Sequence, residues 1–157
     1  MTTAEDEGPP PTGFRGDWGR LGAAERAAAR YLLSDANPRG NRAVEAVPVS
    51  GVLGRRTPDF RVDGVPVELK TVGGVRIAGL VGEGLTKKLS GAIASRIMDA
   101  RGQAPNVVVD LREQEGITLE IAETAVGRAF GADARAGIES VRFIGPGFDE
   151  TYTRRRR

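Results

Sequence analysis

Residues 57–72 read TPDFRVDGVPVELKTV, a pattern of two short strands joined by a tight turn. The turn is Asp63-Gly64, because glycine accepts the positive φ that a two-residue type I′ hairpin turn requires. A turn at this place sets the register of both strands. It pairs Val62 with Val65, Arg61 with Pro66, Phe60 with Val67 and Asp59 with Glu68.

The predicted hairpin has one apolar face and one largely charged face. Successive side chains of a strand point to opposite faces, so the register divides the residues into two sets. The apolar set, which we expect against a core, is Phe60, Val62, Val65, Val67 and Leu69. The other set is Asp59, Arg61, Pro66, Glu68 and Lys70.

The second face brings two carboxylates together. Asp59 and Glu68 lie directly opposite each other in this register, and like charges in such a pair are destabilising. Carboxylate oxygens are the ligands that Mg²⁺ takes, with water and a substrate phosphate completing its shell. Lys70 stands beside Glu68, where it can position a nucleophilic water or stabilise a phosphate. The alternative is a surface hairpin with a Glu–Lys pair and a solvated aspartate.

The order Pro58-Asp59, then Glu68-Leu69-Lys70 on the next strand, resembles the motif of the PD-(D/E)XK nucleases. The resemblance implies a restriction-endonuclease-like αβββαβ core, an α/β fold with one mixed sheet flanked by helices. It also implies that Asp59 and Glu68 bind Mg²⁺ or Mn²⁺. Many members carry an acidic residue on the helix before the core strands, and Glu25 occupies the matching place; the alternative is that Glu25 is solvated.

The composition excludes several kinds of active site. The 157 residues contain no histidine and no cysteine, which rules out Ser–His–Asp and Cys–His catalysis and Cys/His zinc sites. Any hydrolysis therefore depends on carboxylates, lysine and a bound metal. A net charge of +2 permits an anionic partner without requiring one. No apolar run approaches the roughly 20 residues that span a bilayer, and the start lacks a signal-peptide pattern.

The pattern along the chain predicts one domain at residues 19–150. Residues 1–18 are expected to be a disordered, proline-rich lead, and residues 151–157 a basic tail. The apolar spacing predicts helices, strands and a flap between them. The helices are 19–36, 86–101 and 118–130; the strands outside the hairpin are 43–49, 106–111 and 140–144; the glycine-rich flap is 73–84.

Several basic residues are candidates for phosphate contact. Thr86 is expected to cap the second helix, which puts Lys87 and Lys88 in its first turn, where helix N-termini bind anions. The alternative is two ordinary surface lysines. Arg55 and Arg56 precede the motif and are more simply interpreted as part of a solvated loop.

Within the PD-(D/E)XK nucleases, the small size is most similar to the C-terminal tRNA-nuclease domains of contact-dependent growth inhibition (CdiA-type) toxins. The segment ARGQAPNV at residues 100–107 resembles their Gln-containing segment, which makes Gln103 a candidate substrate-binding residue. The resemblance implies action on RNA, tRNA above all, in the bacterial cytoplasm, and a cognate immunity protein as partner. The alternatives are a DNA endonuclease of the same fold and a non-catalytic module that binds nucleic acid or protein.

Overall fold

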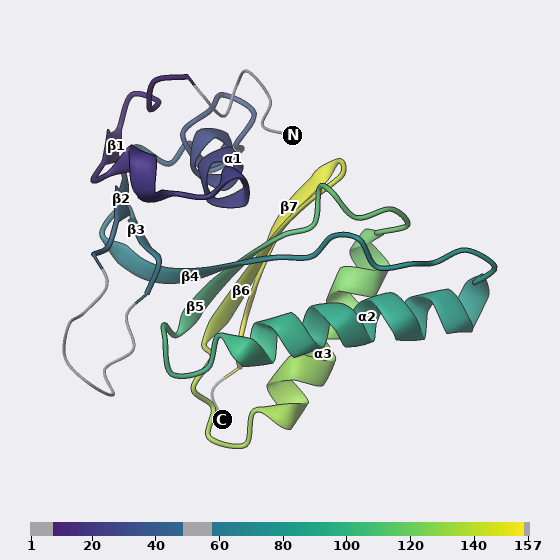
Figure 1. The fold of residues 1–157 in the computed structure, drawn as a ribbon. Coiled ribbons are helices and arrows are strands. Elements are labelled where there is room, and N and C mark those ends of the chain that lie inside the picture. Colours follow the sequence, from purple (N-terminus) through teal and green to yellow (C-terminus); the bar gives the residue numbers. More distant parts are fainter. Residues whose placement is uncertain (1–7, 49–57, 156–157) are drawn as a thin grey trace. The chain divides into compact units, whose positions relative to one another are not determined.

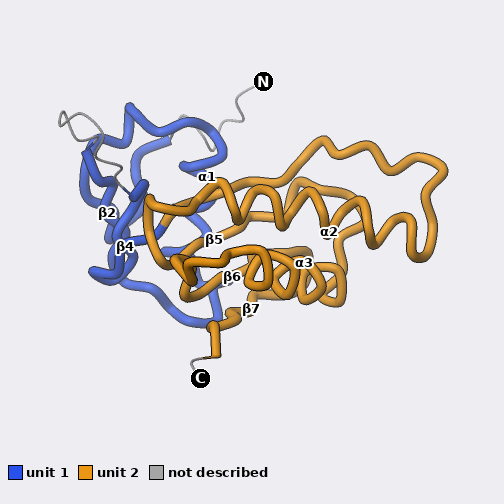
Figure 2. The backbone as a smooth tube through the Cα atoms, turned by 90° about the horizontal axis from the view of Figure 1, so that it is seen from below, with its two compact units in different colours: residues 1–67 blue, residues 68–157 orange. Residues whose placement is uncertain are grey.

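The computed structural model describes residues 8–48 and 58–155. The chain divides into two compact units, Met1–Val67 and Glu68–Arg157 (Figure 2). The elements in chain order (Figure 1) are β1 (Phe14–Arg15), the 3-10 helix η1 (Trp18–Arg20), α1 (Ala23–Leu32), β2 (Val44–Ala46), β3 (Phe60–Val62), β4 (Val65–Thr71), α2 (Gly82–Asp99), β5 (Asn106–Asp110), α3 (Leu119–Ala132), β6 (Ser140–Gly145) and β7 (Phe148–Thr153).

The described strands form one mixed sheet of seven in the order β1-β2-β3-β4-β5-β6-β7. Strand β1 runs parallel to β2, and β5 runs parallel to β6. The pairs β2–β3, β3–β4 and β6–β7 are antiparallel. The predicted α/β class with one mixed sheet is therefore confirmed. Among the described helices, none is both long and apolar enough to cross a bilayer.

The hairpin of β3 and β4 has the register that the turn predicts. Phe60 pairs with Val67, Arg61 with Pro66 and Val62 with Val65. Asp63 and Gly64 have φ values of 49° and 83°, as a type I′ turn requires. Asp63, the first residue of this turn, also forms hydrogen bonds to the residues just before β2.

Asp63 holds the start of β2 through its carboxylate. Its oxygens accept hydrogen bonds from the Asn41 side chain at 2.8 Å and from the backbone N–H groups of Arg42 and Ala43, each at 2.9 Å. The Asn41 bond, with help from the two backbone bonds, lowers the pKa of Asp63. The hairpin turn is thus also the clamp that joins β2 to β3.

The two predicted faces of the hairpin are not uniformly buried and exposed. Val65 was expected in the core but is 48% exposed, because it adjoins the turn at the projecting end of the hairpin. Glu68, which was expected on the charged face of the hairpin, is only 2% exposed. Strand β4 continues past β3 and lies between β3 and β5 in the sheet, so its later residues are interior.

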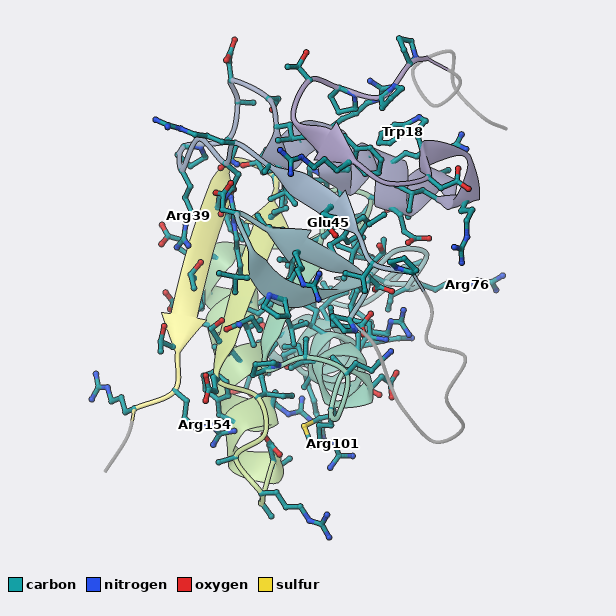
Figure 3. All side chains as sticks on the ribbon, turned by 90° about the vertical axis from the view of Figure 1, so that its left-hand side faces the viewer. Trp18, Arg39, Glu45, Arg76, Arg101 and Arg154 are labelled. Atoms are coloured by element: carbon teal, nitrogen blue, oxygen red, sulfur yellow. The ribbon has the colours of Figure 1, made fainter. Side chains whose placement is uncertain are left out.

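The fold begins earlier than predicted. Phe14–Arg15 forms strand β1 beside β2, so the expectation of a disordered lead over residues 1–18 is wrong for this part. Phe14 meets Trp18 edge to face at 4.8 Å, and the Arg30 guanidinium lies 4.9 Å from the Trp18 ring centre. Figure 3 shows Trp18 with its neighbouring side chains. Residues 1–7 lie outside the described part.

In the second unit, helices α2 and α3 pack on each other and on β5 and β6. Val107, Val109, Val141 and Phe143 point from the strands into this core, and each is at most 1% exposed. The run of β-branched residues therefore forms a buried strand, as predicted. Helix α2 supplies the stripe Leu89, Ile93 and Ile97.

Helix α2 begins at Gly82 rather than at Thr86. Val81 is its N-cap, so the prediction that Thr86 caps the helix is wrong. The glycines before Thr86 favoured a loop, but the packing of Leu85 against the core extends the helix. Lys87 and Lys88 are exposed and lie beyond the first turn, where the N-terminal N–H groups no longer point at a bound anion.

The glycine-rich segment before α2 is tied to the rest of the second unit. The Gln114 amide accepts from the Val75 N–H at 2.8 Å and donates to the Val75 carbonyl at 3.0 Å. Gln114 is only 5% exposed. The Gln114 side chain thus bonds both backbone groups of Val75, as a neighbouring strand would. The predicted flap is therefore hydrogen-bonded to the rest of the second unit at Val75.

The chain end contains a strand that the sequence pattern did not predict. Strand β7 pairs with β6 around the turn at residues 146–147, so Thr151 to Thr153 are not part of a tail. Arg154 donates to the carbonyls of Ile138 and Phe130 and pairs with Asp133 at 2.9 Å. The polar residues Asp149, Glu150, Thr151 and Thr153 left no apolar alternation by which β7 could be recognised in the sequence. Arg156 and Arg157 lie outside the described residues, as do Arg55 and Arg56.

Candidate functional site

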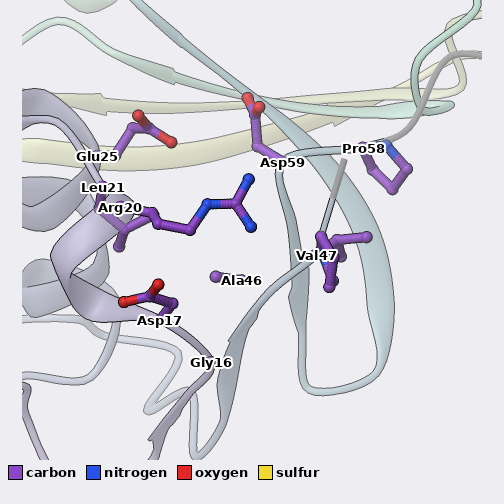
Figure 4. Close-up of a pocket in the computed structure, with 10 residues that line it drawn as sticks. Gly16, Asp17, Arg20, Leu21, Glu25, Ala46, Val47, Pro58 and Asp59 are labelled. Atoms are coloured by element: carbon purple, nitrogen blue, oxygen red, sulfur yellow. The ribbon is translucent and has the colours of Figure 1, made fainter. Parts of the chain in front are cut away.

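A pocket of about 320 Å³ lies wholly within the first unit. Its charged walls are Glu25 and Asp59, together with Asp17 and Arg20 (Figure 4). The remaining lining is Gly16, Leu21, Ala46, Val47, Pro48 and Pro58. The structure thus brings together Glu25 and Asp59, two acidic residues that the sequence proposed for one site from separate elements.

Glu25 is placed by the start of α1. It occupies the third position of the helix, and its Oε1 accepts a hydrogen bond from the Gly22 N–H at 3.2 Å. An acidic side chain is stabilised there by the helix dipole. Glu25 is half-buried, beside a stripe formed by Ala28, Ala29 and Leu32. Its helix-capping bond leaves the side chain at the pocket wall.

Asp59 is placed by the strands that the hairpin turn aligns. Its carbonyl accepts a hydrogen bond from the Val47 N–H at 3.0 Å, which extends the pairing of β2 with β3 by one step. Pro58 precedes it and also lines the pocket. The carboxylate of Asp59 consequently reaches the pocket from the strand side, while Glu25 reaches it from the helix side.

Glu68 and Lys70 lie on β4, at the start of the second unit. Glu68 is buried and Lys70 is half-buried. The pairing of Phe60 with Val67 is the register that an Asp59–Glu68 pair needs. Asp59 and Glu68 belong to different units, and their pairing stays a prediction.

The other predicted binding residues lie in the second unit. Lys87 and Lys88 are exposed on α2. Gln103 lies in the turn after α2, with its N–H bonded to the Ala100 carbonyl at 3.1 Å. Its side-chain oxygen is buried without a hydrogen-bond partner among the described residues. Gln103 therefore has a hydrogen-bond acceptor that the described part of the fold does not use.

Arg20 and Asp17 line the pocket but were not among the predicted site residues. Asp17 is the N-cap of η1, where its Oδ1 accepts from the Gly19 N–H at 3.1 Å. Arg20 ends η1, and Figure 4 shows its side chain extending into the pocket. Asp17 fell in the expected lead, and Arg20 fell at the start of the predicted helix 19–36, outside the apolar stripe on which the placement of Glu25 depended.

The pocket offers oxygen ligands of the kind that Mg²⁺ accepts. Mg²⁺ in proteins is commonly held by one or two carboxylates, with water and substrate phosphate in the remaining positions. Glu25 and Asp59 supply such carboxylates from two separate elements of the pocket lining. Within the described ranges there is no group of three or more acidic, histidine or cysteine side chains close enough to hold a metal. The donor set fits a Mg²⁺ shared with substrate better than a permanent metal cage.

The architecture is that of an α/β protein with a mixed sheet, and it is similar to a solved structure. No family model and no curated protein matches the sequence. One chain of the CdiA-CT/CdiI toxin and immunity complex from Burkholderia pseudomallei has the same fold, with a TM-score of 0.50 and 21% sequence identity. The match covers 83% of each chain. At this identity the likeness shows the fold alone.

Proposed function

We propose that this chain is a metal-dependent nuclease, the toxin domain of a contact-dependent growth inhibition system, and that it cleaves RNA, with tRNA favoured. The observation that carries the proposal is the pocket that Glu25, from helix α1, and Asp59, the residue before β3, both line. The likeness in fold to a chain of a toxin and immunity complex supports it. The PD-(D/E)XK-like motif supplies the remaining residues.

Each proposed residue has a distinct task. The Asp59 and Glu68 carboxylates would hold the metal, and Glu25 would contribute its carboxylate from the helix side of the pocket. Lys70 positions the attacking water or stabilises charge on the phosphate. A bound Mg²⁺ or Mn²⁺ lowers the pKa of its water and stabilises the charge of the transition state. Without histidine in the chain, these groups are the available acid–base machinery.

The burial of Glu68 changes how its role is tested. A carboxylate that is 2% exposed contacts the protein on all sides, so truncation to alanine leaves a cavity as well as removing a ligand. Glu68→Gln keeps the volume and removes the charge. It is therefore the better variant for separating catalysis from folding.

The proposed partner is a cognate immunity protein, as in the complex whose fold is similar. Co-expression with the neighbouring gene of the native locus, followed by purification of one tagged chain, tests whether a complex forms. Growth arrest by the chain alone, relieved by the second gene, is the expected result.

Cleavage assays test the proposed activity directly. Purified protein is incubated with total RNA, tRNA or plasmid DNA, with Mg²⁺, Mn²⁺ or chelator. We expect tRNA cleavage with metal and none in chelator. Asp59→Ala, Glu68→Gln and Lys70→Ala should each lower the rate by at least about a hundredfold, the loss typical for removal of a catalytic group. Glu83→Ala, an exposed acidic residue of α2, is the matched control.

The outcomes separate the proposal from its alternatives. Cleavage of plasmid but not RNA would identify a DNA endonuclease. Binding of nucleic acid without metal-dependent cleavage would identify a non-catalytic module. Full activity in chelator, or an Asp59→Ala protein that cleaves as fast as the wild type, would refute the proposed site.

A further inference from the structure

Arg20 is the cationic residue among those that line the first-unit pocket. The other charged lining residues are Asp17, Glu25 and Asp59, all acidic. Figure 4 shows the guanidinium pointing into the pocket among these carboxylates. The guanidinium of Arg20 makes no hydrogen bond or ion pair to another described residue.

The neighbouring arginines of the first unit have structural partners. Arg26 donates to the Trp18 carbonyl at 3.2 Å, and its guanidinium lies 5.8 Å from the Trp18 ring centre. Arg30 donates to the Pro9 carbonyl at 2.9 Å. Arg20 therefore projects from a segment that these contacts hold in place. Its guanidinium N–H donors make no hydrogen bond to another described residue.

The carboxylates that line the pocket with Arg20 give it a negative charge that repels a phosphate, and a cation reduces this repulsion. Carboxylates that bind a metal also repel the phosphate that must approach it. A guanidinium offsets this repulsion and stays protonated at every physiological pH. Its planar fork donates two parallel hydrogen bonds to a phosphate, which a lysine ammonium cannot do.

We propose that Arg20 contacts a backbone phosphate of the nucleic-acid substrate and so positions that strand in the pocket beside Asp59 and Glu25. This inference rests on the proposed nuclease function and adds a substrate-binding residue to it. The contact is made to phosphate and carries no base specificity. Arg20 acts on the cleaved strand from the helix side of the pocket.

Binding and cleavage by substituted proteins test this role. The substitutions are Arg20→Ala and Arg20→Lys, with Arg39→Ala as the matched control. Arg39 is exposed, belongs to the same unit and does not line the pocket (Figure 3). Its replacement by alanine removes the same positive charge as Arg20→Ala. RNA affinity is measured in chelator, where the proposed cleavage is off, at several salt concentrations. Single-turnover cleavage is then measured with Mg²⁺.

Loss of a charge-assisted phosphate contact should weaken binding by Arg20→Ala about tenfold or more. The slope of log affinity against log salt should fall by about 0.7 for a single strand or 0.9 for a duplex. Arg20→Lys should keep the slope while losing part of the affinity. Arg39→Ala should bind within twofold of the wild type. Thermal melting of each variant shows whether the fold is retained, which is expected because both arginines are exposed.

The possible failures are distinguishable. A wild type that binds and cleaves RNA, with Arg20→Ala and Arg39→Ala giving the same affinity and slope, would overturn the role of Arg20 and leave the nuclease function standing. A wild type that neither binds nor cleaves RNA or DNA would overturn both. If Arg20→Ala melts early, the Lys variant decides, since affinity equal to the wild type with an unchanged slope would refute the guanidinium contact.

Discussion

Replacement of Asp63 by alanine should loosen the strand that positions Asp59. The Asp63 carboxylate accepts three hydrogen bonds, one from the Asn41 side chain and two from the Arg42 and Ala43 N–H groups. Each would contribute about 1.5–3 kcal/mol if buried, because the acceptor is charged. Asp63 is exposed and water competes for these donors, so about 0.5–1 kcal/mol each is the appropriate scale. We therefore expect Asp63→Ala to cost the first unit about 1.5–3 kcal/mol.

The pH dependence of this effect follows from the pKa of Asp63. Its partners lower that pKa, so the folded state favours the ionised carboxylate. The stabilisation is fully present above the ordinary aspartate pKa and is lost as pH falls through the lowered value of the folded state. Wild type and Asp63→Asn should consequently differ at neutral pH and converge in strong acid.

Amide hydrogen exchange measures the effect at the bonded groups themselves. In the wild type, the Arg42 and Ala43 amides should be protected, and in Asp63→Ala their exchange should approach that of an open chain. Gly64→Ala is a useful companion, because its φ of 83° strains an alanine while leaving the Asp63 bonds chemically intact. Unchanged protection at Arg42 and Ala43 in Asp63→Ala would refute the clamp.

Three further outcomes are expected. Gln114→Ala breaks both bonds to Val75, and trypsin should then cut after the exposed Arg76 about tenfold faster, with cutting after Arg101 as the internal control. Arg154→Ala leaves the buried Asp133 without its ion pair and should cost about 2–3 kcal/mol in urea unfolding, whereas Arg155→Ala should cost almost nothing; equal effects would contradict the anchoring role. Burial and the bond to Glu123 raise the pKa of Tyr152 to about 12, so stability from this group is full below pH 10 and lost between pH 10 and about 12; Tyr152→Phe should remove that loss from the alkaline unfolding curve.

The hairpin was predictable because its information is local. Asp63-Gly64 adopts a geometry that few other dipeptides accept, and the register of β3 and β4 follows by counting from the turn. The buried strand β5 was predictable for a similar reason, since Val107 to Val109 have no polar position between them. Periodicity likewise placed α2 and α3 to within a few residues, except for the start of α2.

The elements that escaped prediction depend on contacts distant in sequence. Strand β1 has two residues and exists through its pairing with β2, about 30 positions later. Strand β7 reads FDETYT, and its polar residues give no regular apolar alternation. The strand is recognised only from its antiparallel pairing with β6. The burial of Glu68 has the same origin, because neighbouring strands decide which part of β4 is interior.

The candidate site was predictable in part. Glu25 was proposed from its place on the first helix, and it does line a pocket with Asp59. Arg20 was missed because the predicted helix 19–36 does not include a separate short turn; in the structure Arg20 ends the 3-10 helix η1, and α1 begins only at Ala23. A local signal was nevertheless present. Asp17 is an N-cap residue type, and in the structure it caps the short 3-10 helix Trp18–Arg20.

The packing of Trp18 between Phe14 and the arginines gives the protein a built-in optical reporter. Trp18 is the single tryptophan of the sequence, so tryptophan emission comes from the first unit alone. The circular dichroism of helices comes mostly from α2 and α3, which are longer than α1 and belong to the second unit. Heating one sample while recording both signals would follow the two units separately. Coincident midpoints would mean a cooperative chain, and a lower midpoint for the tryptophan signal would mean that the first unit, with its pocket, can open while the second stays folded.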